Sequence, residues 1–433
     1  MNYKVTGGKT LSGEVTTNIS KNAAVVLLAA SLLNKGTTTL KKMPHIEEVN
    51  RVIEILKSIG VSVEWVGGDV VIKPPEEFTL DTIDKVAAGK VRSIILLTAP
   101  LAHCYDSFEL PLPGGCKLGG RTMMPHIDAL SKLGIHIGES ENEGMYSVEA
   151  SNRHAANIVM YEASDTGTEN ALMAAALMPK VTTIKFASAN YMVQDLCVFL
   201  QQCGVKIEGI GTTTFVVHGV SSVDADITAY PSEDPIESMF FISLAATTHS
   251  KFSVKRCPID FLELELATLD SMGFRYNRSK EYIAENGLTK LVDLELLGGD
   301  LIESPEKIAP RPYPGINIDN LPYFVPIATQ AKGKTLIHDW VYEVRPQYYL
   351  EMNKLGAKVT RIDQHRVEVE GPTKLHAADI ETPPALRPAT LLLIGMLAAE
   401  GESILRDVYP INRGYERLHE RLKTLGADIE AIE

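Results

Sequence analysis

The chain has 433 residues, of which 45% are hydrophobic and 22% charged, and its formal net charge is -13 at pH 7. This profile is typical of a globular protein that is too long for one ordinary core, so we expect two domains. The negative charge and the lack of a basic run in the sequence argue against nucleic acid or an anionic membrane as a partner. The sequence shows neither a secretory signal nor an apolar run long enough to span a membrane, and it therefore predicts a cytoplasmic location.

The first predicted helix is an apolar stretch, NAAVVLLAASLL (residues 22–33), and the strand-like GTTTLKKM (residues 36–43) follows it. Similar stretches return later as ENALMAAALM (residues 169–178) and PATLLLIGMLAAE (residues 388–400). They are apolar on almost every face, so we expect these helices to be buried.

A second helix-like stretch closes each unit at a glycine and is followed by an alternating, strand-like pattern. These glycines are Gly60, Gly134, Gly204, Gly273, Gly356 and Gly426. A glycine there suits a helix C-terminus, where a positive φ turns the chain into the next strand. Most intervals are 69 to 74 residues, and the one from Gly273 to Gly356 is 83.

The repeat predicts an α/β fold of six units, each with the order strand, buried helix, strand, amphipathic helix, strand. Six units form two inside-out, β-prism-like domains of three, with sheets outside, helices inside and a cleft between the domains. We expect residues 21–230 to form the N-terminal domain. Residues 1–20 should join residues 231–433 in the C-terminal domain.

Charged residues recur near the starts of the buried helices, where unpaired N–H groups and the helix dipole favour anions. Counting back from the glycines gives Lys21, Arg92, Glu169, Glu237, Asp319 and Arg387. A second recurring position, shortly before the glycine, gives Arg121, Arg345 and Arg413. If both domains present these helix ends to each other, the cations line a cleft suited to phosphate and carboxylate groups. Any one of these arginines could instead be a solvated or salt-bridged surface residue.

A glycine-rich segment, LPLPGGCKLGGR (residues 110–121), predicts a mobile surface loop around Cys116. Lys117 and Arg121 are close in sequence, and nearby cations favour a reactive thiolate. The thiol could be a nucleophile or a general acid. The other four cysteines are read as small hydrophobic residues, and the odd number and irregular spacing indicate reduced thiols without a metal-ligand pattern.

At these motifs the chain resembles the UDP-N-acetylglucosamine 1-carboxyvinyltransferase branch of the enolpyruvyl transferase family, over essentially its whole length. The motifs are SKNAAV (residues 20–25), VRSI (91–94), LPGGC…GGR (112–121), GTEN (167–170) and NRGYERL (412–418). The loop with cysteine is specific to this branch, and the related shikimate branch lacks it. The resemblance implies two inside-out α/β domains, with a catalytic loop at residues 112–121.

The resemblance also implies the reaction and the residues that perform it. Phosphoenolpyruvate would give its enolpyruvyl group to the 3-hydroxyl of UDP-N-acetylglucosamine, the first committed step of peptidoglycan precursor synthesis. Cys116 would protonate the methylene carbon or form an adduct, and it would be alkylated by fosfomycin. Asp319 would take the proton of the hydroxyl. The phosphoenolpyruvate site would comprise Lys21, Arg92, Arg121, Arg387 and Arg413. The acceptor site would comprise Asn22, Arg121, His126, Ser164, Asp165, Thr166, Asp319 and Val341. Arg345 would support the cleft. Neither a metal nor an organic cofactor is implied.

The sequence departs from the family pattern mainly on the acceptor side. Met124 stands where an aspartate is expected, Glu162 where a lysine is expected, and residues 189–192 read Ala-Asn-Tyr-Met in place of Arg-Glu-Pro-Glu. Two alternatives therefore stay open: the same chemistry on a different nucleotide or sugar, and an inactive paralog that binds a nucleotide sugar and regulates. The retention of Cys116, Lys21 and Asp319 argues against the inactive paralog.

Overall fold

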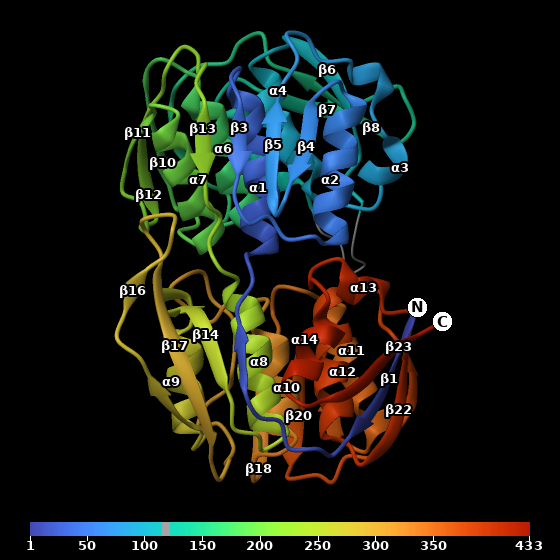
Figure 1. Ribbon diagram of the computed structural model, residues 1–433. Coiled ribbons are helices and arrows are strands. Elements are labelled where there is room, and N and C mark those ends of the chain that lie inside the picture. The colour runs from blue at the N-terminus through green and yellow to red at the C-terminus, as the bar shows by residue number, and fades with distance from the viewer. Residues whose placement is uncertain (115–121) are drawn as a thin grey trace.

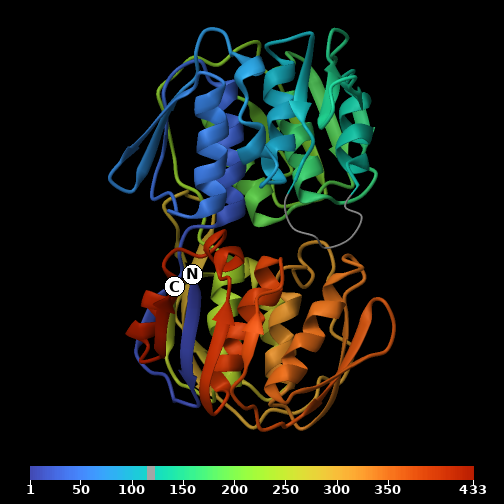
Figure 2. The same ribbon diagram turned by 90° about the vertical axis from the view of Figure 1, so that its right-hand side faces the viewer.

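The computed structural model describes residues 1–114 and 122–433 and shows two halves, one above the other (Figure 1). In each half the sheets lie outside and helices fill the centre, as the second view also shows (Figure 2). Cys116 and Arg121 lie outside the described residues. The α/β class with inside-out halves, predicted from the repeat, is confirmed.

The inner helices are the apolar ones, and their side chains are buried on nearly every face. Every residue of α8 is buried, for example. The inner helices are α1 (Lys21–Ala30), α4 (Thr98–Ala102), α6 (Asp165–Ala176), α8 (Pro235–Thr247), α10 (Phe324–Ala328) and α12 (Leu386–Ala398). The helices α4 and α10 are short and follow 3-10 turns, η3 (Ser93–Leu97) and η5 (Leu321–Tyr323). Each contains a proline, Pro100 or Pro326, which lacks the N–H of a regular helical hydrogen bond.

The amphipathic helices end near the six glycines, all of which have a positive φ between 76° and 93°. Gly60, with φ 93°, turns the chain from α2 into β4 and shows why the position requires glycine. These helices are α2 (Glu47–Ser58), α5 (Met124–Ser131), α7 (Tyr191–Gln202), α9 (Glu263–Ser271), α11 (Arg345–Tyr349) with the turn η6 (Leu350–Leu355), and α14 (Leu418–Thr424). The short segments η1 (Ser31–Leu33), η2 (Leu80–Thr82), α3 (Lys85–Ala88), η4 (Ile259–Phe261) and α13 (Tyr409–Asn412) complete the helical elements of the described residues.

The described strands form six sheets, one for each unit. Their orders are β13-β3-β5-β4, β6-β8-β7, β11-β12-β10-β9, β15-β17-β14-β2, β18-β20-β19 and β21-β22-β1-β23. In the N-terminal half the strands are β3 (Thr38–Leu40), β4 (Ser62–Val66), β5 (Asp69–Lys73), β6 (Ser107–Pro111), β7 (His136–Glu139), β8 (Met145–Glu149), β9 (Asn157–Val159), β10 (Val181–Lys185), β11 (Lys206–Glu208), β12 (Thr214–His218) and β13 (Ile227–Ala229). In the other half they are β1 (Asn2–Gly7), β2 (Glu14–Thr16), β14 (Ser253–Pro258), β15 (Arg275–Arg278), β16 (Tyr282–Ile283), β17 (Lys290–Gly298), β18 (Gly333–His338), β19 (Lys358–Arg361), β20 (Arg366–Gly371), β21 (Asp379–Glu381), β22 (Gly401–Arg406) and β23 (Asp428–Ile432).

Each sheet contains a strand that the sequence pattern missed. In five of the six sheets of the described residues it is the return arm of a hairpin, and it lies between the two strands that follow the helices, antiparallel to both, as β5 lies between β3 and β4. In the sixth sheet β1 occupies this central place, with Tyr3 opposite Leu405 and Ala431. The beginning of the chain therefore completes the last unit.

Two chain segments pass between the halves, and they pair with each other. Ile19 and Glu233 form an antiparallel bridge, Ser20 N–H donates to the Ser232 carbonyl at 2.8 Å, and Asp234 N–H donates to the Asn18 carbonyl at 2.8 Å. These pairings support the proposed division at residues 20 and 230.

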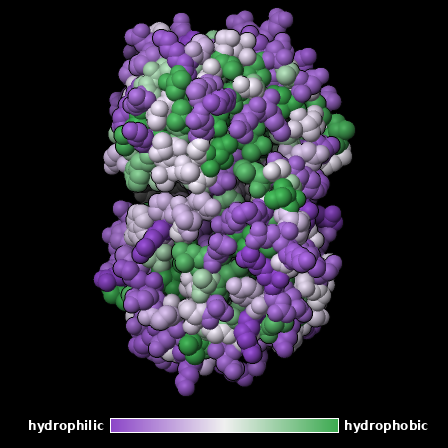
Figure 3. Space-filling model, turned by 90° about the vertical axis from the view of Figure 1, so that its left-hand side faces the viewer, coloured by the Kyte–Doolittle hydropathy of each residue, from purple (hydrophilic) through white to green (hydrophobic). Residues whose placement is uncertain are grey.

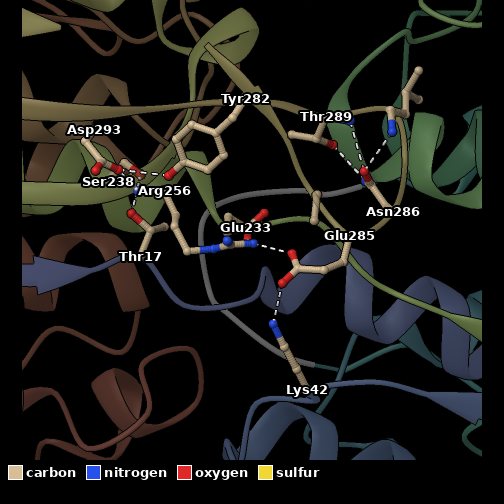
Figure 4. A network of polar contacts seen from close by, with 12 residues as sticks. Thr17, Lys42, Glu233, Ser238, Arg256, Tyr282, Glu285, Asn286, Thr289 and Asp293 are labelled. Atoms are coloured by element: carbon tan, nitrogen blue, oxygen red, sulfur yellow. Dashed lines mark hydrogen bonds and ion pairs between the residues drawn. The ribbon is translucent and has the colours of Figure 1, made fainter. Parts of the chain in front are cut away.

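A third connection comes from the hairpin of β16 and β17, whose tip reaches the N-terminal half (Figures 1 and 4). Lys42 Nζ lies 2.6 Å from Glu285, and Glu285 pairs with Arg256, which donates to Glu233 at 2.7 Å. Asn286 Nδ2 donates to Asp195 on α7 at 2.9 Å. The hairpin lies within the 83-residue interval and accounts for part of its extra length.

Candidate active site

A cleft of about 600 Å³ lies between the two halves, and residues of both halves line it. The space-filling view shows an indentation between the halves on one face (Figure 3). All the site residues predicted from the sequence that the structure describes lie along this cleft: Lys21, Asn22, Arg92, His126, Ser164, Asp165, Thr166, Asp319, Val341, Arg345, Arg387 and Arg413. The predicted Cys116 and Arg121 lie outside the described residues.

The start of α1 contributes a cation at a helix N-terminus. Lys21 is the first helical residue, and Ser20 caps the helix by accepting from Ala23 N–H at 3.3 Å. Among the described residues Lys21 has neither a hydrogen-bond partner nor an ion-pair partner for its ammonium group. Asn22 donates to the Tyr191 hydroxyl at 3.1 Å. A free ammonium group next to the positive end of a helix is a site for an anion.

Arg92 lies just before η3, on the same side of the cleft. Its guanidinium donates to the Thr122 carbonyl at 2.9 Å, which ties it to the segment that follows the undescribed residues. A guanidinium at the edge of the cleft is suited to bind a phosphate or carboxylate.

The start of α6 holds three of the predicted acceptor-side residues in a hydrogen-bonded cluster. Ser164 caps the helix through Gly167 N–H at 3.2 Å, and Asp165 accepts from the Ser188 hydroxyl and from Asn190 Nδ2. Burial raises the pKa of Asp165, and the nearby Asp319 adds to the rise against the lowering effect of these two donors. The Asp165 carboxyl is therefore closer to neutrality than an exposed aspartate.

His126 is buried, and both of its ring nitrogens face polar partners. Nε2 lies 3.1 Å from the Thr166 hydroxyl, and Asn170 Nδ2 donates to Nδ1 at 2.8 Å. In the neutral ring this arrangement puts the proton on Nε2, so that Thr166 accepts it. His126 thereby joins α5 to α6 under the acceptor side of the cleft.

In the C-terminal half, Asp319 lies between two arginines. Its carboxylate oxygens are 3.7 Å from Arg345 and 3.5 Å from Arg387. The Asp319 side chain is 27% exposed, whereas the two arginines are buried. A ligand in the cleft can therefore reach this carboxylate.

Arg345 is held from behind by residues that sequence reasoning did not single out. Its Nε donates to Asp339, which is also fully buried and accepts from the Tyr349 hydroxyl at 2.8 Å. Another nitrogen donates to the Ile318 carbonyl at 2.8 Å, next to Asp319. Asp339 directly follows β18, and an aspartate after a buried strand is the signal that could have identified it.

Arg387 is held in a similar way. Its guanidinium donates to the Tyr415 hydroxyl at 3.1 Å, and Tyr415 is bonded to Tyr323. Burial raises the pKa of both phenols. Tyr415 belongs to the NRGYERL motif, yet its partner Tyr323 lies far away in the sequence.

Arg413 forms an ion pair across the cleft with Glu48, the second residue of α2, at 2.6 Å. Glu48 is only 5% exposed. Because the two residues belong to different halves, this pair links the halves at the cleft. An anionic ligand that binds Arg413 competes with Glu48.

One of the helix-start assignments is corrected by the structure. Glu169 is the fifth residue of α6, so it lies one turn inside the helix, and Asp165 takes the place that corresponds to Lys21. Glu237 is in the first turn of α8, but it accepts from Asn18 N–H at 2.7 Å and pairs with Arg421 at 2.8 Å, next to the crossing segments. The distance back from the glycines varies between units, which is why counting misplaced Glu169.

The described residues contain no cluster of three His, Cys, Asp or Glu side chains that could hold a metal ion. Within this described part of the chain, every helix is too short or too polar to cross a membrane.

The family model of EPSP synthase (3-phosphoshikimate 1-carboxyvinyltransferase) matches residues 5–422. The chain is 31% identical over 432 residues to a UDP-N-acetylglucosamine 1-carboxyvinyltransferase of Bradyrhizobium diazoefficiens, covering 99% of this chain and 98% of that one. It is 33% identical to the enzyme of that name from Wolinella succinogenes, covering 98% of each. Among solved structures, the enolpyruvyl transferase NikO from Streptomyces tendae is similar in fold, with a TM-score of 0.84 at 22% identity over 99% of this chain and 98% of that chain.

Proposed function

The chain belongs to the EPSP synthase family, and from this premise we propose that it transfers the enolpyruvyl group of phosphoenolpyruvate to the 3-hydroxyl of UDP-N-acetylglucosamine. The full-length relatives that carry this activity in their names support the choice of acceptor. The proposal places the enzyme in the cytoplasm, in peptidoglycan precursor synthesis, and hence in cell-wall formation and the maintenance of cell shape.

The observation that carries the proposal is the carboxylate of Asp319, partly exposed to the cleft and flanked by Arg345 and Arg387. A transferase of this kind needs a base for the hydroxyl and cations for the phosphate and carboxylate of phosphoenolpyruvate. Lys21 and Arg92 supply cations from the opposite half. The cleft therefore combines a base with cations on both sides.

In the proposed reaction, Asp319 takes the proton of the acceptor hydroxyl, and the hydroxyl oxygen forms a bond to C2 of phosphoenolpyruvate. Cys116 gives a proton to C3, so that the methylene becomes a methyl group. The tetrahedral adduct then loses a proton from this methyl group, and the C2–O bond to phosphate breaks. The products are the enolpyruvyl ether and inorganic phosphate. Lys21, Arg92, Arg387 and Arg413, with Arg121, stabilise the phosphate and carboxylate charges throughout.

The acceptor is tested by phosphate release from phosphoenolpyruvate with a panel that includes UDP-N-acetylglucosamine, UDP, UMP and shikimate 3-phosphate. We expect turnover with UDP-N-acetylglucosamine. Turnover with another member and none with this one would assign a different acceptor. Failure of the whole panel, with nucleotide-sugar binding retained, would favour the inactive paralog.

A specific observation keeps the different acceptor as the second candidate. Glu162 lines the cleft next to Ser164, where the resemblance places contacts with the sugar or diphosphate. A carboxylate there repels a diphosphate, whereas a lysine would attract it. Glu162→Lys should therefore lower the KM of UDP-N-acetylglucosamine if the diphosphate lies here, and an unchanged KM would argue that it lies elsewhere.

The role of Cys116 is tested by fosfomycin labelling and peptide mapping. Burial raises the pKa of Cys203 and of Cys257 to about 12 and also raises that of Cys104 and Cys197, so these thiols should react slowly. We expect the adduct on Cys116, accelerated by UDP-N-acetylglucosamine and abolished in Cys116→Ser. Cys116→Asp should keep turnover, because a carboxylic acid can still donate a proton, and should resist the drug. Adducts on the other cysteines alone would remove Cys116 from the mechanism.

A further inference from the structure

Glu169 is a buried carboxyl that lines the cleft and that the proposed mechanism does not use. Glu169 is only 2% exposed and lies in the interior of α6. Among the described residues, neither a hydrogen-bond donor nor a cation lies within bonding distance of its carboxyl oxygens. Buried polar groups are almost always paired, because an unpaired one costs about 1–3 kcal/mol.

The equivalent position of the first inner helix, α1, is apolar. The helices α1 and α6 begin in the same way, with the serine caps Ser20 and Ser164, so their residues can be compared in register. The fifth residue of α1 is Val25, and the fifth residue of α6 is Glu169. Val25 is 5% exposed and lines the same cleft. A carboxyl therefore stands where the equivalent helix has an aliphatic side chain.

The surroundings favour the neutral form of this carboxyl. Ile95 and Leu96 of η3, which line the cleft with it, are also buried. Burial raises the pKa of Glu169 well above its ordinary value, and the carboxyl of Asp165, one turn earlier on α6, raises it further. A neutral carboxyl has an O–H that can donate a hydrogen bond, which a carboxylate lacks.

The position of Glu169 relates it to the acceptor rather than to phosphoenolpyruvate. Asp165 lies close enough to Asp319 for their charges to interact, and Asp319 is the proposed base for the acceptor hydroxyl. An anionic ligand is better bound by the cations of the cleft, while a neutral hydroxyl or carbonyl oxygen suits an uncharged donor.

We propose that Glu169 is an acceptor-binding residue, which presents a protonated carboxyl at the floor of the cleft and donates a hydrogen bond to a hydroxyl or carbonyl oxygen of the bound acceptor. This inference rests on the proposed function for the identity of the acceptor. It adds a neutral hydrogen-bond donor to a part of the cleft that Ile95 and Leu96 also line. An acceptor without an oxygen at this point leaves the carboxyl unpaired and binds less well.

Two variants separate a binding role from a structural one. Glu169→Gln keeps a neutral donor of similar size, and Glu169→Val restores the residue type of α1. We expect Glu169→Val to raise the KM of UDP-N-acetylglucosamine about tenfold, the loss of one hydrogen bond, with the KM of phosphoenolpyruvate unchanged within about twofold. Glu169→Gln should stay within about threefold of wild type for both substrates. The thermal midpoint of Glu169→Val should not fall, because an apolar side chain suits the site.

The contrary results are equally specific. An unchanged acceptor KM in Glu169→Val would overturn the proposal. A rise in the KM of phosphoenolpyruvate alone would show that Glu169 contacts phosphoenolpyruvate and not the acceptor, and would also overturn the proposal. A loss in Glu169→Gln as large as in Glu169→Val would show that an ionised carboxylate is required, and would also overturn it.

Infrared spectroscopy tests the protonation state of Glu169 independently of which acceptor is used. The spectrum of wild type minus Glu169→Gln should contain the carbonyl stretch of a protonated carboxyl at pH 7, and the band should shift when the acceptor binds. Absence of the band would overturn the proposal whatever the substrate. If wild type fails to use UDP-N-acetylglucosamine, the proposed function fails instead, and the shift and the KM values are measured with the acceptor that the phosphate-release panel identifies.

Discussion

Replacing Asp339 with asparagine should test whether the buried pair behind Asp319 positions the base. Asp339 and Arg345 are both 0% exposed, and Arg345 also contacts the Ile318 carbonyl next to Asp319. Removing the Asp339 charge leaves a buried guanidinium whose remaining anionic neighbour, Asp319, is 3.7 Å away. Breaking a buried ion pair typically costs about 3–5 kcal/mol. Because Asp319 still partly compensates the charge of Arg345, we expect Asp339→Asn to lower the free energy of unfolding by about 3 kcal/mol.

The matched control is Tyr349→Phe, which removes one hydrogen bond to the same carboxylate and leaves the ion pair intact. It should cost about 1.5 kcal/mol. Urea unfolding followed by tryptophan fluorescence gives both values. Turnover, measured by phosphate release well below the melting temperature, should fall about 100-fold in Asp339→Asn, because a displacement of about 1 Å at a catalytic group has effects of this size.

Equal destabilisation in the two variants would refute the assignment of the buried charge pair. Full turnover in Asp339→Asn would show that Arg345 does not need this anchor to keep Asp319 in place.

Two further predictions concern the connection between the halves. Arg256→Met should lower the free energy of unfolding in urea by about 3 kcal/mol, because it leaves Glu233, whose side chain is 3% exposed, without its cation. Lys42→Met should lower it by less than about 1 kcal/mol, because the side chains of the Lys42–Glu285 pair are 56% and 38% exposed. Equal losses in the two variants would contradict the roles given to these two pairs of Figure 4. Burial raises the pKa of Asp234 to about 6, against 3.8 in the unfolded chain, so the folded state binds this proton more tightly and the ionised group costs stability as the pH rises from about 4 through 6. Asp234→Asn should therefore gain stability relative to wild type as the pH rises from 5 to 7.5, by about 1.5 kcal/mol of the about 3 kcal/mol that the whole shift represents, and a difference that is constant across this range would contradict the prediction.

The repeat could be predicted from sequence because its signals are local. A glycine at the end of an amphipathic helix reports a backbone conformation that other residues rarely adopt, and Gly60 and the five equivalent glycines all have a positive φ. The buried helices were visible for the same kind of reason, because a helix such as α8 is apolar on every face. Neither inference needed knowledge of which segments meet in space.

In five of the sheets the return strand follows the strand after the glycine along the chain, as β5 follows β4. The repeat pattern marks only one strand at this point of each unit, so the second was not predicted. The sixth sheet was harder, since its central strand comes from the other end of the chain. A periodic pattern reports which face of a strand is buried, and it carries little information about its neighbours.

In the site, too, the residues marked by local sequence signals were predicted, whereas contacts between residues distant in sequence were not. Lys21, Asp319 and Arg387 were found because motifs and helix starts mark them. The partner of Arg413 was not found, since Glu48 is separated from it by hundreds of residues, and an ordinary glutamate at the start of α2 gives no sign of the pair.

Glu169 combines both cases and shows what the structure adds. The sequence marked it as a charge near a helix start, where a carboxylate needs no further explanation because the helix dipole favours it. Its actual place, one turn inside α6 and in register with Val25, removes that explanation. A carboxyl that lacks a partner among the described residues, at a position where α1 has an aliphatic side chain, is then suited to bind a ligand oxygen, as we propose. The cleft that it lines is where such a partner binds.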